Sequence, residues 1–344
     1  MPELPDLSLY VDAIRARCVG HALQRLRIAN PFLLRSVQPP LEAFEGLRLE
    51  HVTLLGKRLV FVFPETLCLV VHLMIAGRLH WKPAGSTTGR SRLRPRASAD
   101  RAASGPPPIP RKIGLAAFDF DDGTLILTEA GSKRRASLHA VRGAAELAAM
   151  DPGGIDVMQA DRDAFATVLT SERHTLKRAL TDPHLFSGIG NAYSDEILHA
   201  ARLSPMRQTT QLDAEEITRL HQATQSTLRL WMDRLRDRAG DRFPDKVTAF
   251  VDGMAAHGRY GHPCPRCGTP IQRLVYARNE ANYCPACQTG GTLLADRALS
   301  RLLRADWPKS LEDLDEYKAA RTIKGQETSE ESPGRRVTSE KKGQ

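Results

Sequence analysis

The spacing of apolar residues predicts a helix followed by a β-rich region in the first third of the chain. Residues 5–18 show a loosely helical apolar pattern, and Pro5 and Asp6 suit the first turn of a helix. From about residue 20 to residue 80 the pattern changes to short apolar runs typical of strands, clearest at 59–63 and 67–73. Residues 118–127, interrupted by Asp122-Gly123, indicate a β-hairpin. We therefore expect two packed β-sheets.

From about residue 160 the apolar spacing becomes helical. Phe165, Val168 and Leu169 begin this pattern, and a longer helix is expected from about residue 213 to residue 238. Another short helix is expected at 293–303, and the polar end from about residue 324 has the composition of a disordered tail. The segment between residues 83 and 111 is rich in Pro, Gly, Ser and Arg, which predicts a flexible loop insertion.

Composition and charge narrow the classes of partner and compartment. The chain has 344 residues, enough for two or three domains, and a formal net charge of +9 that favours a polyanionic partner. No apolar run is long enough to cross a membrane, and Glu3 and Asp6 interrupt any secretory leader, so we expect a cytoplasmic protein. In that reducing compartment, cysteines favour metal binding or burial over disulfide bonds.

Four of the six cysteines form two C-x2-C pairs separated by sixteen residues: Cys264, Cys267, Cys284 and Cys287. Two such turns can meet on the strands of a β-hairpin and surround a zinc ion with four thiolates. Because cysteine fills all four positions, the site is closed and the zinc is expected to be structural. Cys18 and Cys68 have no such partners and lie among apolar residues, which favours simple burial.

Residues 176–196 predict a helix, a glycine-containing turn and a second helix that starts near Asn191. Gly188 and Gly190 permit a positive φ and close approach of another group to the backbone. Backbone N–H groups at such a helix start can hold a phosphate, with Lys177 and Asn191 as additional donors.

The chain begins Met1-Pro2-Glu3, and removal of Met1 would leave a secondary amine on Pro2 beside a carboxylate. Such an amine can attack an aldehyde-like carbon and form a charged Schiff base. Its reference pKa of about 8 leaves a usable unprotonated fraction near neutral pH. The alternative is a proline without a catalytic role at a mobile terminus.

Taken together, these segments resemble the formamidopyrimidine-DNA glycosylase/endonuclease VIII family of base-excision-repair enzymes. The matching pieces occur in family order: Pro2-Glu3-Leu4-Pro5, Gly56-Lys57-Arg58, His72-Leu73, residues 176–196, and the cysteine pairs ending in Cys287-Gln288. The resemblance implies an α+β multidomain protein with a catalytic β-sandwich at 1–150, interrupted by the insertion at about 83–111. A helix–two-turn–helix DNA-binding domain at 151–255 and a zinc-ribbon β-hairpin at 256–290 would follow, then a short helix and tail at 291–344.

The resemblance also implies a bifunctional DNA glycosylase and abasic-site (AP) lyase with one structural Zn²⁺. Such an enzyme binds damaged double-stranded DNA, and we expect it to act as a monomer. Pro2 would attack the anomeric carbon of a flipped nucleotide, Glu3 would assist ring opening and proton transfer, and the strand would be cut by β- and δ-elimination. Lys57 matches a β-hairpin lysine that contacts phosphate and assists catalysis.

Further residues match the family's DNA contacts and framework. Lys177 and Asn191 match phosphate contacts, Tyr193 matches a packing residue, and Glu196 matches an acidic support group near Pro2.

The chain departs from the usual family pattern at residues that contact DNA. Asp6 stands where the family usually has Glu, and Ile75 takes the place of the wedge methionine, with Met74 beside it. Either apolar side chain can fill the gap left by a flipped base.

Arg134 or Arg135 is expected to substitute for the family's arginine and phenylalanine opposite the lesion. In the zinc hairpin, the position of the family's phosphate-binding arginine is occupied here by Asn279, and Arg278 is the residue before it.

Two questions stay open at this level. The Leu4 start favours oxidised purines, such as formamidopyrimidines and 8-oxoguanine, but oxidised pyrimidines remain an alternative because the wedge residues differ. A non-catalytic DNA- or RNA-binding protein on the same scaffold is a second alternative. A retained Met1 would favour that reading, because it blocks the amine.

Overall fold

The computed structural model describes residues 1–85, 105–131, 133–244, 247, 251–276, 279–295 and 308–316. Most of the helix expected at 293–303, the tail expected from 324, the central part of the expected insertion and Arg278 lie outside the described residues. Within these ranges, no helix combines the length and the apolar character needed to cross a membrane.

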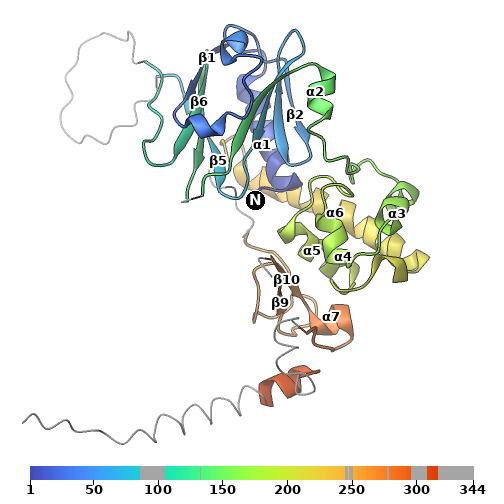
Figure 1. Ribbon diagram of the computed structural model, residues 1–344. Coiled ribbons are helices and arrows are strands. Elements are labelled where there is room, and N and C mark those ends of the chain that lie inside the picture. The colour runs from blue at the N-terminus through green and yellow to red at the C-terminus, as the bar shows by residue number, and fades with distance from the viewer. Residues whose placement is uncertain are drawn as a thin grey trace, which may run out of the picture.

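Two four-stranded antiparallel sheets form the N-terminal part of the molecule and face each other as a sandwich (Figure 1). Their orders are β1-β6-β7-β5 and β2-β3-β4-β8. The strands are β1 (Leu23–Ile28), β2 (His51–Leu55), β3 (Arg58–Val62), β4 (Leu67–His72), β5 (Gly77–Pro83), β6 (Gly114–Phe120), β7 (Gly123–Glu129) and β8 (Ser137–Arg142). The two packed sheets expected from the apolar runs are therefore confirmed.

The core of the sandwich is closed by the first helix, α1 (Leu4–Cys18), which begins two residues after Pro2. Its apolar face contributes Leu7, Tyr10 and Ile14, all fully buried, to the same core as the strands. Between the two sheets the rings of Phe61 and Phe118 stack with their centroids 5.6 Å apart. Each fully buried apolar side chain of α1 contributes about 1.5–3 kcal/mol of hydrophobic stabilisation, so α1 is firmly fixed to the sandwich.

Helices form the second part of the molecule. They are α2 (Ala144–Ala148), α3 (Arg162–Thr170), α4 (Leu176–Thr181), α5 (Asn191–Ala201) and α6 (Ala214–Ala239). The 3-10 turns found among the described residues are η1 (Pro31–Leu33), η2 (Leu41–Phe44) and η3 (Thr209–Gln211). At the N-terminus of α6, Asp213 and Glu216 each accept the backbone N–H of the other. Tyr193 of α5 packs edge-on against Trp231 of α6, with ring centroids 6.1 Å apart.

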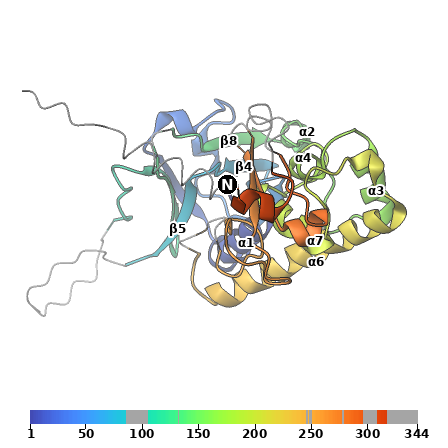
Figure 2. The same ribbon diagram turned by 90° about the horizontal axis from the view of Figure 1, so that it is seen from below.

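The cysteine pairs flank a small antiparallel hairpin of β9 (Gln272–Tyr276) and β10 (Asn279–Tyr283), followed by α7 (Pro285–Thr289). The amino terminus lies where the sandwich, the helices and this hairpin come together, as both views show (Figure 2). Helices α1 and α6 pack against each other, and Arg236 Nε donates to Asp12 Oδ2 at 2.8 Å across this contact. The first residues of the chain therefore reach the helical part.

Candidate active site and zinc centre

Glu3 is buried at the junction, with 2% of its surface exposed, and its carboxylate is held by the start of α5. The backbone N–H groups of Gly190 and Ala192 donate to it at 2.7 and 2.9 Å, and that of Tyr193 at 3.2 Å. These donors belong to the first turn of a helix, where the peptide dipoles also favour a negative charge. Glu3 is thus fixed in position by a segment about 190 residues away in sequence.

This contact explains why glycines stand in the turn before α5. It also shows that the group bound at the start of α5 differs from the one expected. A Cβ at Gly190 would lie 2.5 Å from Glu3 Cδ, and Gly188 has a φ of +81°. The sequence led us to expect a phosphate at this helix start, but the carboxylate of Glu3 occupies it. The backbone donors expected at this helix start are present, but the local motif could not show that a carboxylate of the same chain accepts from them.

Asp6 lies beside Glu3 and is 1% exposed. Its Oδ2 accepts the backbone N–H of Glu3 at 2.9 Å. Burial raises the pKa of Asp6 to about 7, and the nearby charge of Glu3 acts in the same direction, while the Glu3 N–H opposes it. Near neutral pH this carboxyl group is therefore poised between its protonated and ionised forms.

The amino terminus lies near both carboxylates, and Lys57 lies near Glu3. Burial lowers the pKa of the Met1 ammonium group from its usual value, with Arg78 and Lys57 acting in the same direction and Glu3 opposing them. Lys57 follows Gly56, which has a φ of +59°, in the turn between β2 and β3. Burial also lowers the pKa of Lys57, and the charge of Glu3 opposes that shift.

The turn after β4 presents the residues expected to act as a wedge. Met74 has a φ of +52°, and Ile75 is 65% exposed, although it is a large aliphatic side chain. Arg78 Nη1 donates to the Ile75 carbonyl at 3.1 Å and supports the turn. Just before it, His72 at the end of β4 has its pKa lowered to about 4 by burial and by nearby positive groups, so its ring is neutral.

Arg134 and Arg135 are exposed at the segment between β7 and β8. The side chain of Arg134 donates to the Lys112 carbonyl. Buried Glu129 holds the segment by accepting the backbone N–H groups of Arg135 and Ala136 at 2.9 and 3.0 Å. Both guanidinium groups therefore lie on a supported surface segment.

Lys177 does not lie where the sequence led us to expect it. It is 2% exposed, and its Nζ donates to Asp195 Oδ1 at 2.5 Å and to the Asn191 carbonyl at 2.6 Å. An ammonium group enclosed in this way has no surface to offer a phosphate, so we correct its assignment to a structural ion pair between α4 and α5. Asn191, the first residue of α5, is partly exposed.

Asp195 is the centre of a buried polar cluster that the sequence did not reveal. Besides Lys177, it accepts from Asn282 Nδ2 of β10 at 3.2 Å and pairs with His257 Nδ1 at 2.8 Å. All four side chains are at most 4% exposed. The cluster ties α4, α5, the segment after α6 and the hairpin together.

Glu196 and Tyr193 support the same region. Glu196 accepts the backbone N–H groups of Ala255, Ala256 and His257, at 2.8 to 2.9 Å. These bonds give its carboxylate a supporting role in this turn, and its relation to Pro2 stays a prediction. The ring of Tyr193 is fully buried, and burial raises the pKa of its hydroxyl group.

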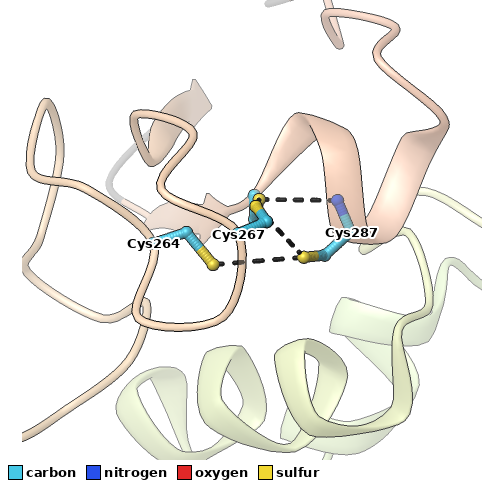
Figure 3. Close-up of side chains that lie close together, drawn as sticks. Cys264, Cys267 and Cys287 are labelled. Atoms are coloured by element: carbon cyan, nitrogen blue, oxygen red, sulfur yellow. Dashed lines mark hydrogen bonds between the residues drawn. The ribbon is translucent and has the colours of Figure 1, made fainter.

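The four cysteines predicted to hold zinc converge, with their Sγ atoms within 4.8 Å of one another. Figure 3 shows Cys264, Cys267 and Cys287 pointing toward one another. Cys267 Sγ lies 3.4 Å from the sulfurs of Cys284 and Cys287, and the Cys264 and Cys287 sulfurs are 4.0 Å apart. A tetrahedral ion with Zn–S bonds of about 2.3 Å needs sulfurs about 3.8 Å apart, so this donor set fits Zn²⁺.

Three family models match the chain in the order of its parts. The formamidopyrimidine-DNA glycosylase N-terminal domain matches residues 1–127, the H2TH domain of the same enzymes matches 150–235, and the zinc finger found in FPG and IleRS matches 261–290. The formamidopyrimidine-DNA glycosylase of Thermus thermophilus is 30% identical over 296 residues, which cover 85% of this chain and 100% of that protein. The chain belongs to the formamidopyrimidine-DNA glycosylase family.

Other relatives agree with this assignment. An uncharacterized formamidopyrimidine-DNA glycosylase-like protein of Mycobacterium tuberculosis is 39% identical over 151 residues, covering 44% of this chain and 94% of that protein. A Lactococcus lactis Fpg solved with DNA containing an abasic site has a TM-score of 0.69 at 21% identity, over 83% of this chain and 99% of that one. At this identity the similarity establishes the shared fold, including the sandwich, the helices and the zinc hairpin.

Within this family fold, local sequence patterns located the cysteines and the glycine turn but missed the polar cluster around Asp195. One signal was present, because Asp195-Glu196 is an acidic pair followed directly by the apolar residues Ile197 and Leu198 of the same helix. Buried carboxylates need partners, so such a pair indicates contacts with other elements. The identities of those partners, His257 and Asn282, depend on the tertiary fold.

Arg278 lies outside the described residues, and Asn279 is placed only through its backbone, as the first residue of β10 opposite Tyr276. Their DNA contacts therefore stay predictions.

Proposed function

We propose that this protein is a base-excision-repair DNA glycosylase that also cleaves abasic sites, with Pro2 as its nucleophile after removal of Met1. The observation that supports this most directly is the fixed position of Glu3, whose carboxylate is held by three N–H groups at the start of α5. A buried carboxylate held beside the amino terminus suits proton transfer at a reacting sugar. Family membership and the zinc hairpin agree with DNA as the partner.

The proposed chemistry uses the Pro2 nitrogen as both nucleophile and electron sink. Its lone pair forms a bond to C1′ of the damaged nucleotide, the N-glycosidic bond breaks, and the base leaves and takes up a proton. The Pro2 nitrogen then loses its N–H proton and O4′ takes one up, so the C1′–O4′ bond breaks and an iminium ion forms between Pro2 and C1′. Loss of a C2′ proton then expels the 3′-phosphate, and loss of the C4′ proton expels the 5′-phosphate. Water hydrolyses the iminium ion to release Pro2.

The surroundings of the amino terminus support this role. Burial lowers the pKa of the Met1 ammonium group, and the same low-polarity surroundings would favour the neutral, nucleophilic amine of Pro2. Pro2 is itself buried, and Lys57 lies close enough to Glu3 for their charges to interact. We assign Glu3 to proton transfer and Lys57 to holding a phosphate of the damaged strand.

A pocket beside this site offers a place for the flipped base. It has a volume of about 770 Å³, and its lining includes Asp6, Trp81, Arg238 and Phe243. Aromatic faces and a few polar groups are the usual means of holding an extrahelical base. The exposed Ile75 supplies the apolar side chain that would fill the gap left in the duplex.

We propose oxidised purines as the substrate, on the basis of the Leu4 start, and a panel of single-lesion duplexes distinguishes them from oxidised pyrimidines. The net charge of +9 supports double-stranded DNA as the partner. We propose a monomer that acts in the cytoplasm, and light scattering of the purified protein tests the first of these two points.

The reaction is tested by borohydride trapping on a duplex with an abasic site. The wild-type protein, with loss of Met1 verified by intact mass, is expected to form a covalent adduct with the DNA. A protein combining Pro2→Gly with Glu3→Gln is expected to trap at least about a hundredfold more slowly, because proton transfer alone contributes about that much. The same chain with an uncleaved amino-terminal tag, whose Pro2 nitrogen is an amide, is expected to form no adduct.

Glu42→Gln is the matched control, since Glu42 is an exposed residue of the same domain on η2. DNA binding without any adduct would identify the non-catalytic alternative. An adduct that persists at the wild-type rate in the tagged chain would reject Pro2 as the nucleophile.

A further inference from the structure

The C-terminal end of α5 is fastened to both cysteine turns of the zinc centre. Arg266, which lies between Cys264 and Cys267, donates from Nη1 to the His199 carbonyl at 3.0 Å. Gln288 donates from Nε2 to the Leu203 carbonyl at 2.9 Å. The hairpin is therefore connected to the end of α5 as well as to the Asp195 cluster in its middle.

His199 makes the most direct of these contacts, because its side chain reaches one of the zinc ligands. Its Nε2 lies 3.2 Å from Cys264 Sγ, and His199 and Cys264 are 4% and 3% exposed. A zinc-bound cysteine is a thiolate, which has no proton to give. In the zinc-loaded protein, the hydrogen in this contact must therefore come from the imidazole.

We infer that His199 is an outer-sphere residue of the zinc centre, whose Nε2–H donates a hydrogen bond to the Cys264 thiolate. The bond disperses negative charge on a site that gathers four thiolates around one divalent ion, and it fixes that site against α5. Hydrogen bonds to metal ligands commonly change metal affinity by about 10–100-fold. This role concerns the metal centre and does not depend on the reaction proposed for Pro2.

The first test measures zinc retention by competition with a chromogenic chelator. His199→Leu is expected to lower zinc affinity by about 10–100-fold, because leucine fills a similar volume but has no N–H to donate. His199→Gln, whose amide nitrogen can take the place of Nε2, is expected to recover part of this loss. His221→Leu serves as the control. His221 is on α6, and its Nε2 hydrogen-bonds to the Ala160 carbonyl at 2.9 Å instead of to a cysteine.

A zinc affinity of His199→Leu equal to that of the control would overturn the inference, and so would a loss that His199→Gln does not reduce at all.

A second test needs no substitution and remains decisive if the variants fold poorly. In the wild-type protein loaded with NMR-active cadmium, the ring of His199 is expected to be the Nε2–H tautomer. Its Nε2 proton should show a scalar coupling to the metal, transmitted through the hydrogen bond and the sulfur. A ring protonated on Nδ1 alone, with no proton on Nε2, would exclude the proposed bond.

Discussion

Glu3 and Asp6 are both buried carboxyl groups on the first turn of α1, but their hydrogen-bond partners differ. Glu3 accepts three backbone N–H groups from α5, whereas the bond found for Asp6 in the described structure is a single N–H, that of Glu3 itself. Burial disfavours the charged form of any carboxyl group unless donors compensate it. This difference accounts for the raised pKa of Asp6, and it gives the active site a group that titrates near neutral pH.

The raised pKa of Asp6 predicts a pH-dependent stability. Between the usual value of 3.8 and the folded value of about 7, the folded chain binds a proton that the unfolded chain releases, so the stabilising contribution falls as pH rises through this window. Asp6→Asn removes the titration and keeps an oxygen for the Glu3 N–H. We expect the difference in free energy of unfolding, Asp6→Asn minus wild type, to rise by about 3 kcal/mol between pH 5 and pH 8, at roughly 1.4 kcal/mol per pKa unit.

Urea unfolding at the two pH values measures this difference. Asp163→Asn, at an exposed site on α3, is the control and should show no such change with pH. An Asp6→Asn protein whose stability tracks wild type at both pH values would show that Asp6 stays ionised throughout.

At the scale of the element, the sequence predicted the helix bounds that are set by residues within the helix itself. A helix was expected at about 213–238 and α6 spans Ala214–Ala239, because its ends are set by Asp213, Glu216 and Gly240 within the element itself. The partner of the α5 start was not predictable, since Glu3 approaches from the other end of the sequence. Lys177 was misplaced for a related reason, because its burial depends on Asp195, a helix away.

The close fit between Glu3 and the α5 start predicts a strong effect of Gly190→Ala. The added Cβ would lie 2.5 Å from Glu3 Cδ, so the carboxylate must move and lose part of its hydrogen bonding. The φ of −133° at this residue suits alanine, so the effect is steric and local. Displacing a reacting group by about 1 Å can cost a hundredfold, and we expect a loss of that order in the single-turnover rate on an abasic-site duplex.

Gly105→Ala is the matched control, because a Cβ at Gly105 has no neighbour within 4 Å in the part of the chain that the structure describes. A Gly190→Ala protein with the wild-type rate would mean that the reaction does not need Glu3 in its observed position.

At the scale of the whole molecule, α5 connects the candidate active site to the zinc centre. Its first turn holds Glu3, Asp195 in its middle bonds Asn282 of the hairpin, and His199 near its end contacts Cys264. The sandwich and the helices each have a separate apolar core, to which the four cysteines do not contribute. The hairpin therefore depends on its metal in a way that the other two parts do not.

Removal of zinc is accordingly expected to separate DNA binding from global folding. Without the ion, the Cys264–Cys287 turns lose the cross-link that holds them together, and small metal-bound units of this kind unfold when the metal is removed. We expect affinity for a duplex containing an abasic-site analogue to fall by about tenfold or more, equivalent to at least about 1.4 kcal/mol, because the hairpin would no longer be positioned against the DNA. With Trp307 replaced by Phe, Trp81 in β5 and Trp231 in α6 report on the other two parts, and their fluorescence should keep its folded spectrum. Readdition of Zn²⁺ should restore affinity. Unchanged affinity in the zinc-free protein would place the hairpin outside the DNA interface, and unfolding of the Trp231 region would show that the ion supports the helical part directly.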